Sequence, residues 1–421
     1  IWGEYVWEGQ LGGGQAVPVG GQFLPDCSGG VCRPGTCEPP VYDNIIEIGP
    51  AELAGPGGLM KPDIAVDSKA QPHIVTIKGG TELHLFHRLA GGWQGGFFAG
   101  LAEYHPTSSD FNSPVIEVDP NDRAWVCSGV WGDPVVEHQN CPVGSGPAVW
   151  TVNSVADAPA KQPCLGPHDF PGNWYHGGHG MELALDPFAP DEAMVGDGRY
   201  SIHLTASNQV TGVVEMPCGH GGEKTEIAMS PRVGQAGVLH ALAGRGNDGT
   251  GFPYDGTYIN STMAKQEAWV LAEVYPHMLE QEGGWWSMGI DLANPQAAYI
   301  YAPLVGVTVN IWDGEKMVYP PDNLYVVDPG AATCGNGMYR YAARWAPARG
   351  GGTFLCWTGQ ADGINQIKVR YLTYVSESDY GPEVVIAPGN QCSIATDSDG
   401  HIHMTYLDGE GLKYRLLKTS Q

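Results

Sequence analysis

Side chains that can move protons, neutralise charge or present flat rings gather in Gly-rich segments between residues 104 and 286. Histidine and tyrosine can act as general acids or bases, and histidine suits this role because its pKa lies near neutral pH. Arginine and lysine pair with anionic groups, and tryptophan and tyrosine offer large apolar faces. The candidates are the catalytic set His105, Tyr175, His179, Arg199 and His220, and the ligand-binding set Trp174, Tyr200, Lys224, Arg245, Asn247 and Trp285.

The basic candidates stand out because the chain is strongly acidic. It has 21 Lys and Arg residues against 46 Asp and Glu, a net charge of −25. This balance argues against a nucleic-acid partner and against binding to an anionic membrane surface. The sequence has no run of 18 apolar residues, which a membrane-spanning helix would need. A local group of Arg199, Lys224 and Arg245 suits a carboxylate, and the Trp and Tyr residues near it suit sugar rings.

Metal and nucleotide motifs are weak. His176 and His179 are three residues apart in HGGHG and could give two metal ligands, with the other ligands unidentified. Acidic turns leave calcium open, although no twelve-residue EF-hand loop occurs. The loop GRGNDGTG lacks the features of a phosphate-binding loop, and no GxSxG or HExxH motif is present. We expect chemistry that requires no cofactor, with calcium or zinc only as a structural ion.

The chain repeats one pattern, in which a short strand leads into a turn and a second apolar strand follows. Seven copies begin at residues 61, 113, 180, 225, 286, 338 and 392, in a chain with 61 Gly and 33 Pro. This periodicity predicts an all-β, seven-bladed β-propeller over residues 41–421. The segment VYDNIIEIG before the first copy is predicted to pair with GLKYRLL and so to close the last blade. A pair of two-sheet β-sandwiches is the alternative fold.

Residues 1–40 are rich in Cys and Gly and are predicted to form a separate irregular arm. The chain holds ten Cys, and an even number in such a composition predicts disulfides and an oxidising compartment, whereas a metal cluster is the alternative. Because the sequence starts at Ile1, we expect a mature product whose export signal has been removed. We therefore predict a secreted or periplasmic protein, and a monomer.

The geometry of a propeller indicates on which face of the fold each candidate residue would lie. The link that enters the first strand of a blade and the turn after its second strand lie on the same face. The candidates from His105 to Asn247 fall in such links and turns of the second, third and fourth copies. We therefore expect them on one face of three neighbouring blades.

At this point the chain resembles secreted seven-bladed propellers that act on uronic-acid polysaccharides, namely ulvan lyases of propeller type and related rhamnose–glucuronate lyases and rhamnosidases. The resemblance lies in KPDIAVDSKAQPHIV, CSIATDSDGHIHMTYLDGEGLKYR and the polar set His105, Tyr175, His179 and Arg199. It implies that Arg199 neutralises a uronate carboxylate, that Tyr175 or His179 removes or returns a proton, and that His105 is a second acid/base or a partner of the carboxylate. The turn VCSGVWGD departs from the family because it has no His. The second histidine of the family therefore has no match in this turn, and His138 or His220 would take its role.

The resemblance implies a polysaccharide lyase that cleaves an acidic polysaccharide by β-elimination, with the intermediate stabilised at the carboxylate. Two alternatives stay open. A glycoside hydrolase of rhamnosidase type would use paired carboxylates, for which Asp110, Asp197, Glu223 and Asp248 are available. A non-catalytic carbohydrate-binding propeller would use the same aromatic and basic residues for affinity alone.

Overall fold

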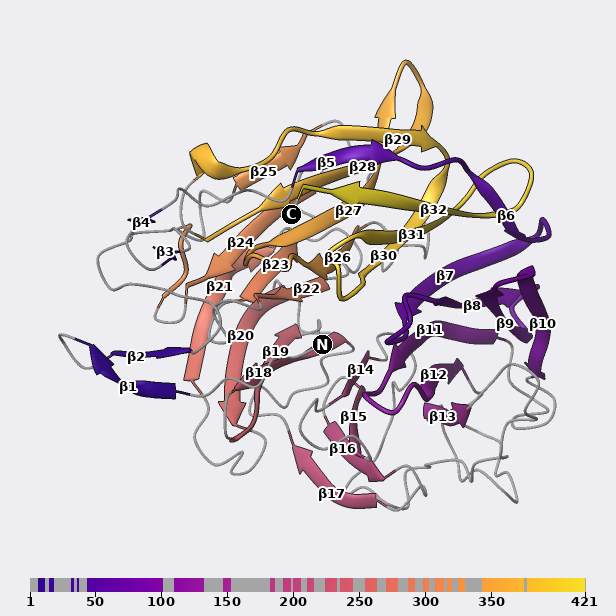
Figure 1. Cartoon of the computed structure of the whole chain (residues 1–421). Helices are drawn as coiled ribbons and strands as arrows, with labels where there is room; N and C mark the ends of the chain where they lie inside the picture. Colours follow the sequence, from indigo (N-terminus) through magenta and orange to yellow (C-terminus); the bar gives the residue numbers. More distant parts are fainter. Residues whose placement is uncertain are drawn as a thin grey trace.

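The computed structural model describes four continuous stretches, residues 44–100, 110–131, 343–374 and 377–420, and shorter segments between residues 7 and 37 and between 147 and 329 (Figure 1). In these residues the fold is all-β, with one 3-10 turn at Glu377–Asp379. No helix in the described residues is long and apolar enough to cross a membrane.

The described strands form seven antiparallel sheets of three to five strands, in chain order. Sheet one holds β7 (Leu59–Val66), β8 (Pro72–Lys78), β9 (Glu82–Leu89) and β10 (Gly92–Gly100). Sheet two holds β11 (Asp110–Val118), β12 (Ala124–Trp131) and β13 (Pro147–Val152). Sheet three holds β14 (Glu182–Leu185), β15 (Glu192–Asp197), β16 (Tyr200–Thr205) and β17 (Val210–Glu215). Sheet four holds β18 (Lys224–Arg232), β19 (Gln235–Gly244), β20 (Tyr254–Thr262) and β21 (Val270–Met278).

Three further sheets complete this series. Sheet five holds β22 (Ser287–Ile290), β23 (Ala298–Ala302), β24 (Val307–Trp312) and β25 (Tyr325–Asp328). Sheet six holds β26 (Ala343–Pro347), β27 (Thr353–Ala361), β28 (Ile364–Leu372) and β29 (Val384–Pro388). Sheet seven holds β30 (Asn390–Thr396), β31 (Ile402–Leu407), β32 (Leu412–Thr419) and β5 (Ile45–Ile48), and β6 (Glu52–Gly55) also pairs with β32. Two short pairs lie before them, β1 (Trp7–Leu11) with β2 (Gln15–Pro18) and β3 (Cys32–Arg33) with β4 (Thr36–Cys37).

Each predicted repeat corresponds to the first two strands of one sheet. The first strand of each sheet lies against the first strand of the next, and β30 of sheet seven lies against β7 of sheet one (Figure 1). Apolar side chains fill the space between neighbouring sheets, as in the cluster of Val75, Leu85 and Ile116 between sheets one and two. The core is therefore divided into layers between sheets, and each sheet depends on both of its neighbours.

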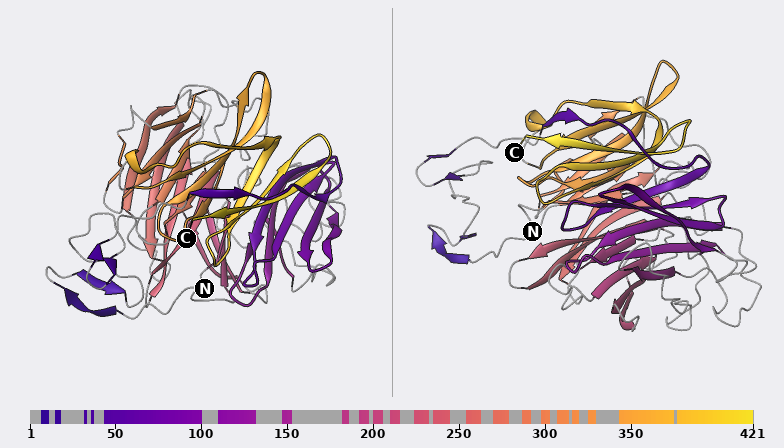
Figure 2. Two further views of the ribbon diagram at one scale, coloured as in Figure 1. Left: turned by 45° about the horizontal axis from the view of Figure 1, so that its top comes forward. Right: turned by 45° about the vertical axis from the view of Figure 1, so that its right-hand side comes forward.

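The predicted pairing of the segment before the first repeat is confirmed. In β5, Ile48 stands opposite Leu417 of β32, and Ile45 stands opposite Thr419. Figure 2 shows the indigo N-terminal strand among the yellow C-terminal strands. The amide of Gly49 donates to the carbonyl of Leu416 at 2.8 Å. Sheet seven is thus built from two segments that lie far apart in the sequence.

The turn between the first and second strands has the same Asp-based construction in sheets one, two and seven. The Oδ1 atom of Asp67, Asp119 or Asp397 accepts the amides two and four residues further on, at 2.8 to 3.0 Å. The residue three positions after the Asp has a positive φ, which Gly400 adopts without steric penalty in sheet seven. The Asp of the repeated turn is therefore a structural acceptor, as the sequence predicts.

The second carboxylate oxygen of each turn Asp reaches a ring six residues further on. Trp125 Nε1 donates to Asp119 Oδ2 at 3.0 Å, and His403 Nε2 lies 3.1 Å from Asp397 Oδ2. Burial opposes ionisation of Asp397, yet the bonds to His403 and to the amide of His401 hold the pKa of this carboxyl below its usual value. These contacts fix the second strand against its turn.

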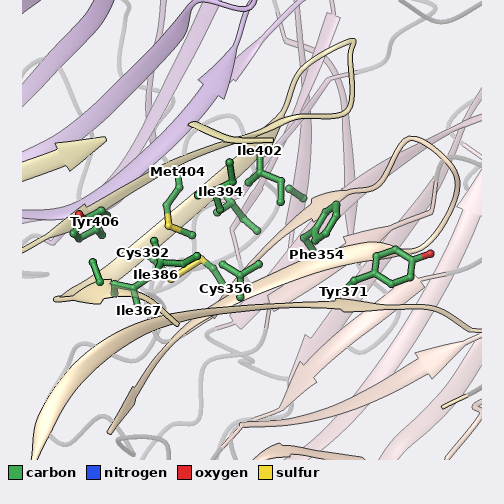
Figure 3. Packing of buried hydrophobic residues seen from close by; sticks show 14 of the residues in the cluster. Phe354, Cys356, Ile367, Tyr371, Ile386, Cys392, Ile394, Ile402, Met404 and Tyr406 are labelled. Atoms are coloured by element: carbon green, nitrogen blue, oxygen red, sulfur yellow. A yellow bond between two sulfur atoms is a disulfide. The ribbon is translucent and has the colours of Figure 1, made fainter. Parts of the chain in front are cut away.

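A disulfide joins Cys356 of β27 to Cys392 of β30, within the core between sheets six and seven (Figure 3). Both sulfurs are buried among apolar side chains such as Ile367, Ile394 and Met404. The bond spans 36 residues. It confirms that the chain forms a disulfide, whereas the sequence predicts no particular pairing. Cys127 lies buried within β12.

We expect that replacing Cys356 and Cys392 together by Ala lowers the free energy of unfolding by about 2–4 kcal/mol, because the cross-link restricts the unfolded chain. Urea unfolding of the double variant against the wild type measures this loss. An unchanged urea midpoint would show that the bond adds nothing to the packing of sheets six and seven.

Candidate functional site

Most of the predicted site lies outside the described residues. This holds for His105, Trp174, Tyr175, His179, Arg199, His220, Arg245, Asn247 and Trp285. The backbones of Tyr200 and Lys224 are described, as the first residues of β16 and β18. The roles predicted for all these side chains remain predictions.

The backbone register shows which ends of the sheets carry these positions. Lys224, at the start of β18, stands opposite Gly244, which immediately precedes Arg245. In sheet one, Leu59 at the start of β7 likewise stands opposite Lys78 at the end of β8. The start of a first strand and the turn after the second strand therefore share one end of the sheet. We call this end the start face, and the opposite end, with the Asp turns, the turn face.

Two neighbouring first strands each carry a β-bulge close to the start face. The register of β7 shifts between Met60 and Asp63, and that of β30 shifts between Asn390 and Ser393. Within these bulges Lys61 has a φ of 55° and Gln391 a φ of 54°. Non-Gly residues seldom adopt this left-handed conformation, and bulges often re-aim side chains next to binding sites.

The two bulges are linked to one another and to sheet six. The amide of Lys61 donates to Gln391 Oε1 at 2.7 Å, and the amide of Gln391 donates to Thr358 Oγ1 at 3.2 Å. Both bulge residues are half-buried. A chain of hydrogen bonds therefore runs from sheet one through sheet seven to sheet six, and holds the strained backbone in place.

Below these bulges Asp63 joins the first strands of several sheets. Its Oδ1 accepts the hydroxyl of Ser393 in β30 at 2.7 Å, and its Oδ2 accepts the amide of Ile116 in β11 at 3.0 Å. Arg344 Nη2 of β26 lies 3.9 Å from Asp63 Oδ1. Asp63 is only 7% exposed, so its negative charge is compensated by donors from sheets two and seven and by the Arg344 guanidinium.

Glu117 is the carboxyl group that faces this cluster from β11. It stands two residues before the turn Asp119, and Ala65, Ala346 and Ala395 occupy the equivalent positions of β7, β26 and β30. Glu117 is exposed to solvent on β11. Partial desolvation and the charge of Asp63 raise the pKa of Glu117, to about 8, against the opposing effect of Arg344.

Glu117 and Asp63 are thus two carboxyl groups in different environments. The pKa of Glu117 is raised, whereas Asp63 is buried and accepts two hydrogen bonds. Two carboxyl groups in contrasting environments are candidates for acid and base roles. Sequence reasoning missed both, although the one Glu among equivalent alanines could have indicated Glu117.

No group of three or more His, Cys, Asp or Glu side chains in the described residues could hold a metal ion. His84 and His87, which could be mistaken for ligands, lie on β9 within sheet one, and His84 Nε2 lies 2.9 Å from Glu82 Oε2. The predicted pair His176 and His179 lies outside the described residues.

Glu117→Gln should change the pH dependence of stability. A carboxyl whose pKa is raised on folding contributes fully below its unfolded value near 4.5, and this contribution is lost as the pH rises through 8. The variant should therefore be more stable than the wild type at pH 9, with the difference shrinking toward pH 5. Thermal unfolding across this range tests it, with the exposed Glu47→Gln as control. Parallel pH profiles for wild type and Glu117→Gln would contradict the raised pKa.

Asp63→Ala should lower the free energy of unfolding by about 3 kcal/mol, because it leaves the Ile116 amide and the Ser393 hydroxyl without their buried acceptor and removes the negative charge beside the Arg344 guanidinium. Ser393→Ala removes one neutral donor and should cost about 1 kcal/mol. Chemical denaturation of both variants gives the comparison, and equal losses would show that Asp63 does no more than bind Ser393.

No protein family and no curated protein matches the sequence. The fold is similar to solved structures at low identity. An ulvan lyase described as a new family of polysaccharide lyase matches with 9% identity and a TM-score of 0.54, over 88% of this chain and 97% of that one. A protein of unknown function from Dyadobacter fermentans matches with 10% identity and a TM-score of 0.50, over 90% of this chain and 100% of that one. The same ulvan lyase is also known bound to -[GlcA(1-4)Rha3S]-.

Sialidases are similar at a lower level. The Hadza microbial sialidase Hz136 has 9% identity and a TM-score of 0.48, over 86% of this chain and 66% of that one. At such identities the likeness to the ulvan lyase concerns the fold alone, because one fold hosts many unrelated activities. The chain is therefore an all-β protein of several antiparallel sheets with propeller-like structural neighbours.

Proposed function

We propose that the chain is a secreted, seven-bladed β-propeller that cleaves a uronic-acid polysaccharide by β-elimination. The succession of seven described sheets, the contacts between their first strands and the pairing of β5 with β32 support the propeller. The fold shared with an ulvan lyase is consistent with it. In this proposal residues 1–40 form a separate arm and residues 41–421 form the propeller.

The observation that carries the proposal is the register at the start face. Lys224 stands opposite Gly244, and Tyr200 stands opposite Asp197 across the turn that contains Arg199. Basic and aromatic positions of neighbouring sheets three and four thus occur at strand starts and at turns between second and third strands. Basic residues at this end of neighbouring sheets, in an otherwise acidic chain, would suit an anionic glycan.

Elimination at a uronate requires three tasks. Arg199 neutralises the carboxylate, so that the proton at C5 becomes acidic and the enolate-like intermediate is stabilised. Tyr175 or His179 removes that proton, and His105 or His220 returns one to the leaving oxygen. Trp174, Tyr200, Lys224, Arg245, Asn247 and Trp285 bind the sugar chain on either side.

No cofactor is needed for this chemistry, and calcium or zinc would be structural. The partner is an acidic polysaccharide or oligosaccharide, not nucleic acid or a membrane, and the protein acts as a monomer. The disulfide between Cys356 and Cys392 supports a secreted or periplasmic location.

Hydrolysis, of the rhamnosidase type, is the second candidate, and the raised pKa of the exposed Glu117 favours it. A carboxyl group of this kind is suited to act as general acid on a glycosidic oxygen. In this case carboxyl substitutions, rather than changes at His or Tyr, would abolish turnover.

The decisive experiment incubates the protein with ulvan and glucuronate-rich gums. Absorbance of an unsaturated uronate product is followed beside an assay for new reducing ends. Absorbance together with new ends would support the lyase, and new ends without absorbance would support the hydrolase. Binding without either signal would leave a non-catalytic carbohydrate-binding propeller.

Arg199→Ala is expected to lower kcat/KM on the uronate polymer by at least about a hundredfold, because the charge of the intermediate loses its partner. Arg349→Ala removes an exposed guanidinium at the turn between β26 and β27, on the turn face, and should leave the rate unchanged. Equal rates for Arg199→Ala and the wild type would contradict the role of Arg199.

A further inference from the structure

We infer that Lys368 and Asp328 are joined by an isopeptide bond that links sheet six to sheet five, and that Glu383 catalyses its formation. The bond is a covalent modification that the folded chain makes from two of its own side chains. It is independent of the glycan chemistry proposed above, because none of the three residues belongs to that site.

The placement of the reacting groups is the first argument. Lys368 Nζ of β28 lies 2.8 Å from Asp328 Oδ2 of β25 and 3.0 Å from Glu383 Oε1. Lys368 and Asp328 are only 8% and 6% exposed, whereas Glu383 is exposed at the edge of the pair. An amine and a carboxyl group held in contact react far more readily than the same groups in solution, because the cost of bringing them together has been met by folding.

The surroundings of the Asp328 carboxyl group supply the second argument. The fully buried Trp357 donates its Nε1 to Asp328 Oδ2 at 2.9 Å. A donor fixed at this oxygen stabilises the negative charge that develops on it when an amine attacks the carboxyl carbon. Trp357 also belongs to the apolar cluster between sheets five and six, which shields one side of the pair from water.

Gly359 of β27 supplies the third argument. A Cβ at this position would lie 2.7 Å from Lys368 Cε and 2.9 Å from Asp328 Oδ2. Both distances are shorter than real Cβ contacts, so a residue other than Gly would push against the pair. The close approach of the β27 backbone therefore confines the amine and the carboxyl group to one another.

Glu383 provides the proton acceptor that the reaction needs. Burial lowers the pKa of Lys368, but the hydrogen bonds to Asp328 and Glu383 outweigh this effect and raise the pKa above its usual value. The pair before reaction is therefore an ion pair, and the ammonium must lose a proton before it can attack. The Glu383 carboxylate, 3.0 Å from Nζ, is placed to accept that proton as a general base.

The step balances without an added reagent. The Lys368 ammonium gives one proton to Glu383, and the resulting amine attacks Cγ of Asp328. The Nζ–Cγ bond forms, the bond from Cγ to Oδ1 breaks, and this oxygen leaves as water. Both protons of the water come from the Lys368 nitrogen, one of them by way of Glu383, which ends as a carboxylate again.

The test is the mass of the whole chain after reduction and denaturation, followed by a protease digest. The wild type should be lighter than its sequence by one water, and the digest should contain a branched peptide that joins Lys368 to Asp328. Lys418 and Glu47 are the internal control, because Nζ and Oε2 lie equally close at 2.8 Å but on the exposed surface. This second pair should stay unlinked.

Three variants separate the roles. Lys368→Arg keeps the positive charge and should have the full mass of its sequence. Asp328→Asn should lose ammonia in place of water, because its amide nitrogen becomes the leaving group. Glu383→Gln changes an exposed side chain and should leave most chains unlinked, with thermal unfolding showing a folded protein.

A wild type of full mass, with no branched peptide, would show an ion pair only and would overturn the inference. A loss of water that persists in Lys368→Arg would place the loss elsewhere in the chain, with the same consequence. Equal linkage in Glu383→Gln and the wild type would show that Glu383 is not the catalyst. None of these results changes the outcome of the glycan assay, so the inference and the proposed function can fail separately.

Discussion

The carboxylate of Asp63 is the point on which the arrangement of the first strands depends. One buried side chain accepts from sheet two and from sheet seven and lies beside the guanidinium of sheet six. A carboxylate in such a place is tolerated only if its donors are present, so it enforces the spacing of the strands that carry them. The bulges at Lys61 and Gln391 lie on two of these strands, and the hydrogen bond from the Lys61 amide to Gln391 Oε1 fixes them relative to each other.

The acidic composition has a similar structural explanation in the described residues. Asp291 accepts the Tyr299 hydroxyl and the Gly352 amide, and Asp328 accepts Trp357 Nε1 and Lys368 Nζ of the neighbouring sheet. Together with the turn Asp residues, these carboxylates supply acceptors to side-chain and backbone donors, which apolar neighbours could not do. Part of the acidic composition of the described residues is therefore structural.

The strands and the Asp turns follow from local patterns, and the pairing of β5 with β32 follows from the missing strand of the last repeat, so the sequence alone predicts them. The contact of Asp63 with Ser393 and Arg344 follows from neither, because it joins individual side chains about 280 to 330 positions apart. The bulge at Lys61 escapes prediction because its φ has no Gly to mark it. The loops that carry His105 to Trp285 lie outside the described residues, so that part of the site rests on sequence reasoning.

Sheet seven combines β5 with the C-terminal strands β30, β31 and β32, and this combination affects the order in which the sheets fold. The hydroxyl of Ser420 accepts the amide of Asn44 across a separation of 376 residues, next to the pairing of β5 with β32. During synthesis β5 appears long before its partner, and its edge stays unpaired until β32 has been made. Sheet seven is therefore the last to form, and sheet one, which packs against it, reaches its final environment only then. A nascent chain that still lacks β32 exposes the strand edge of β5 to other chains.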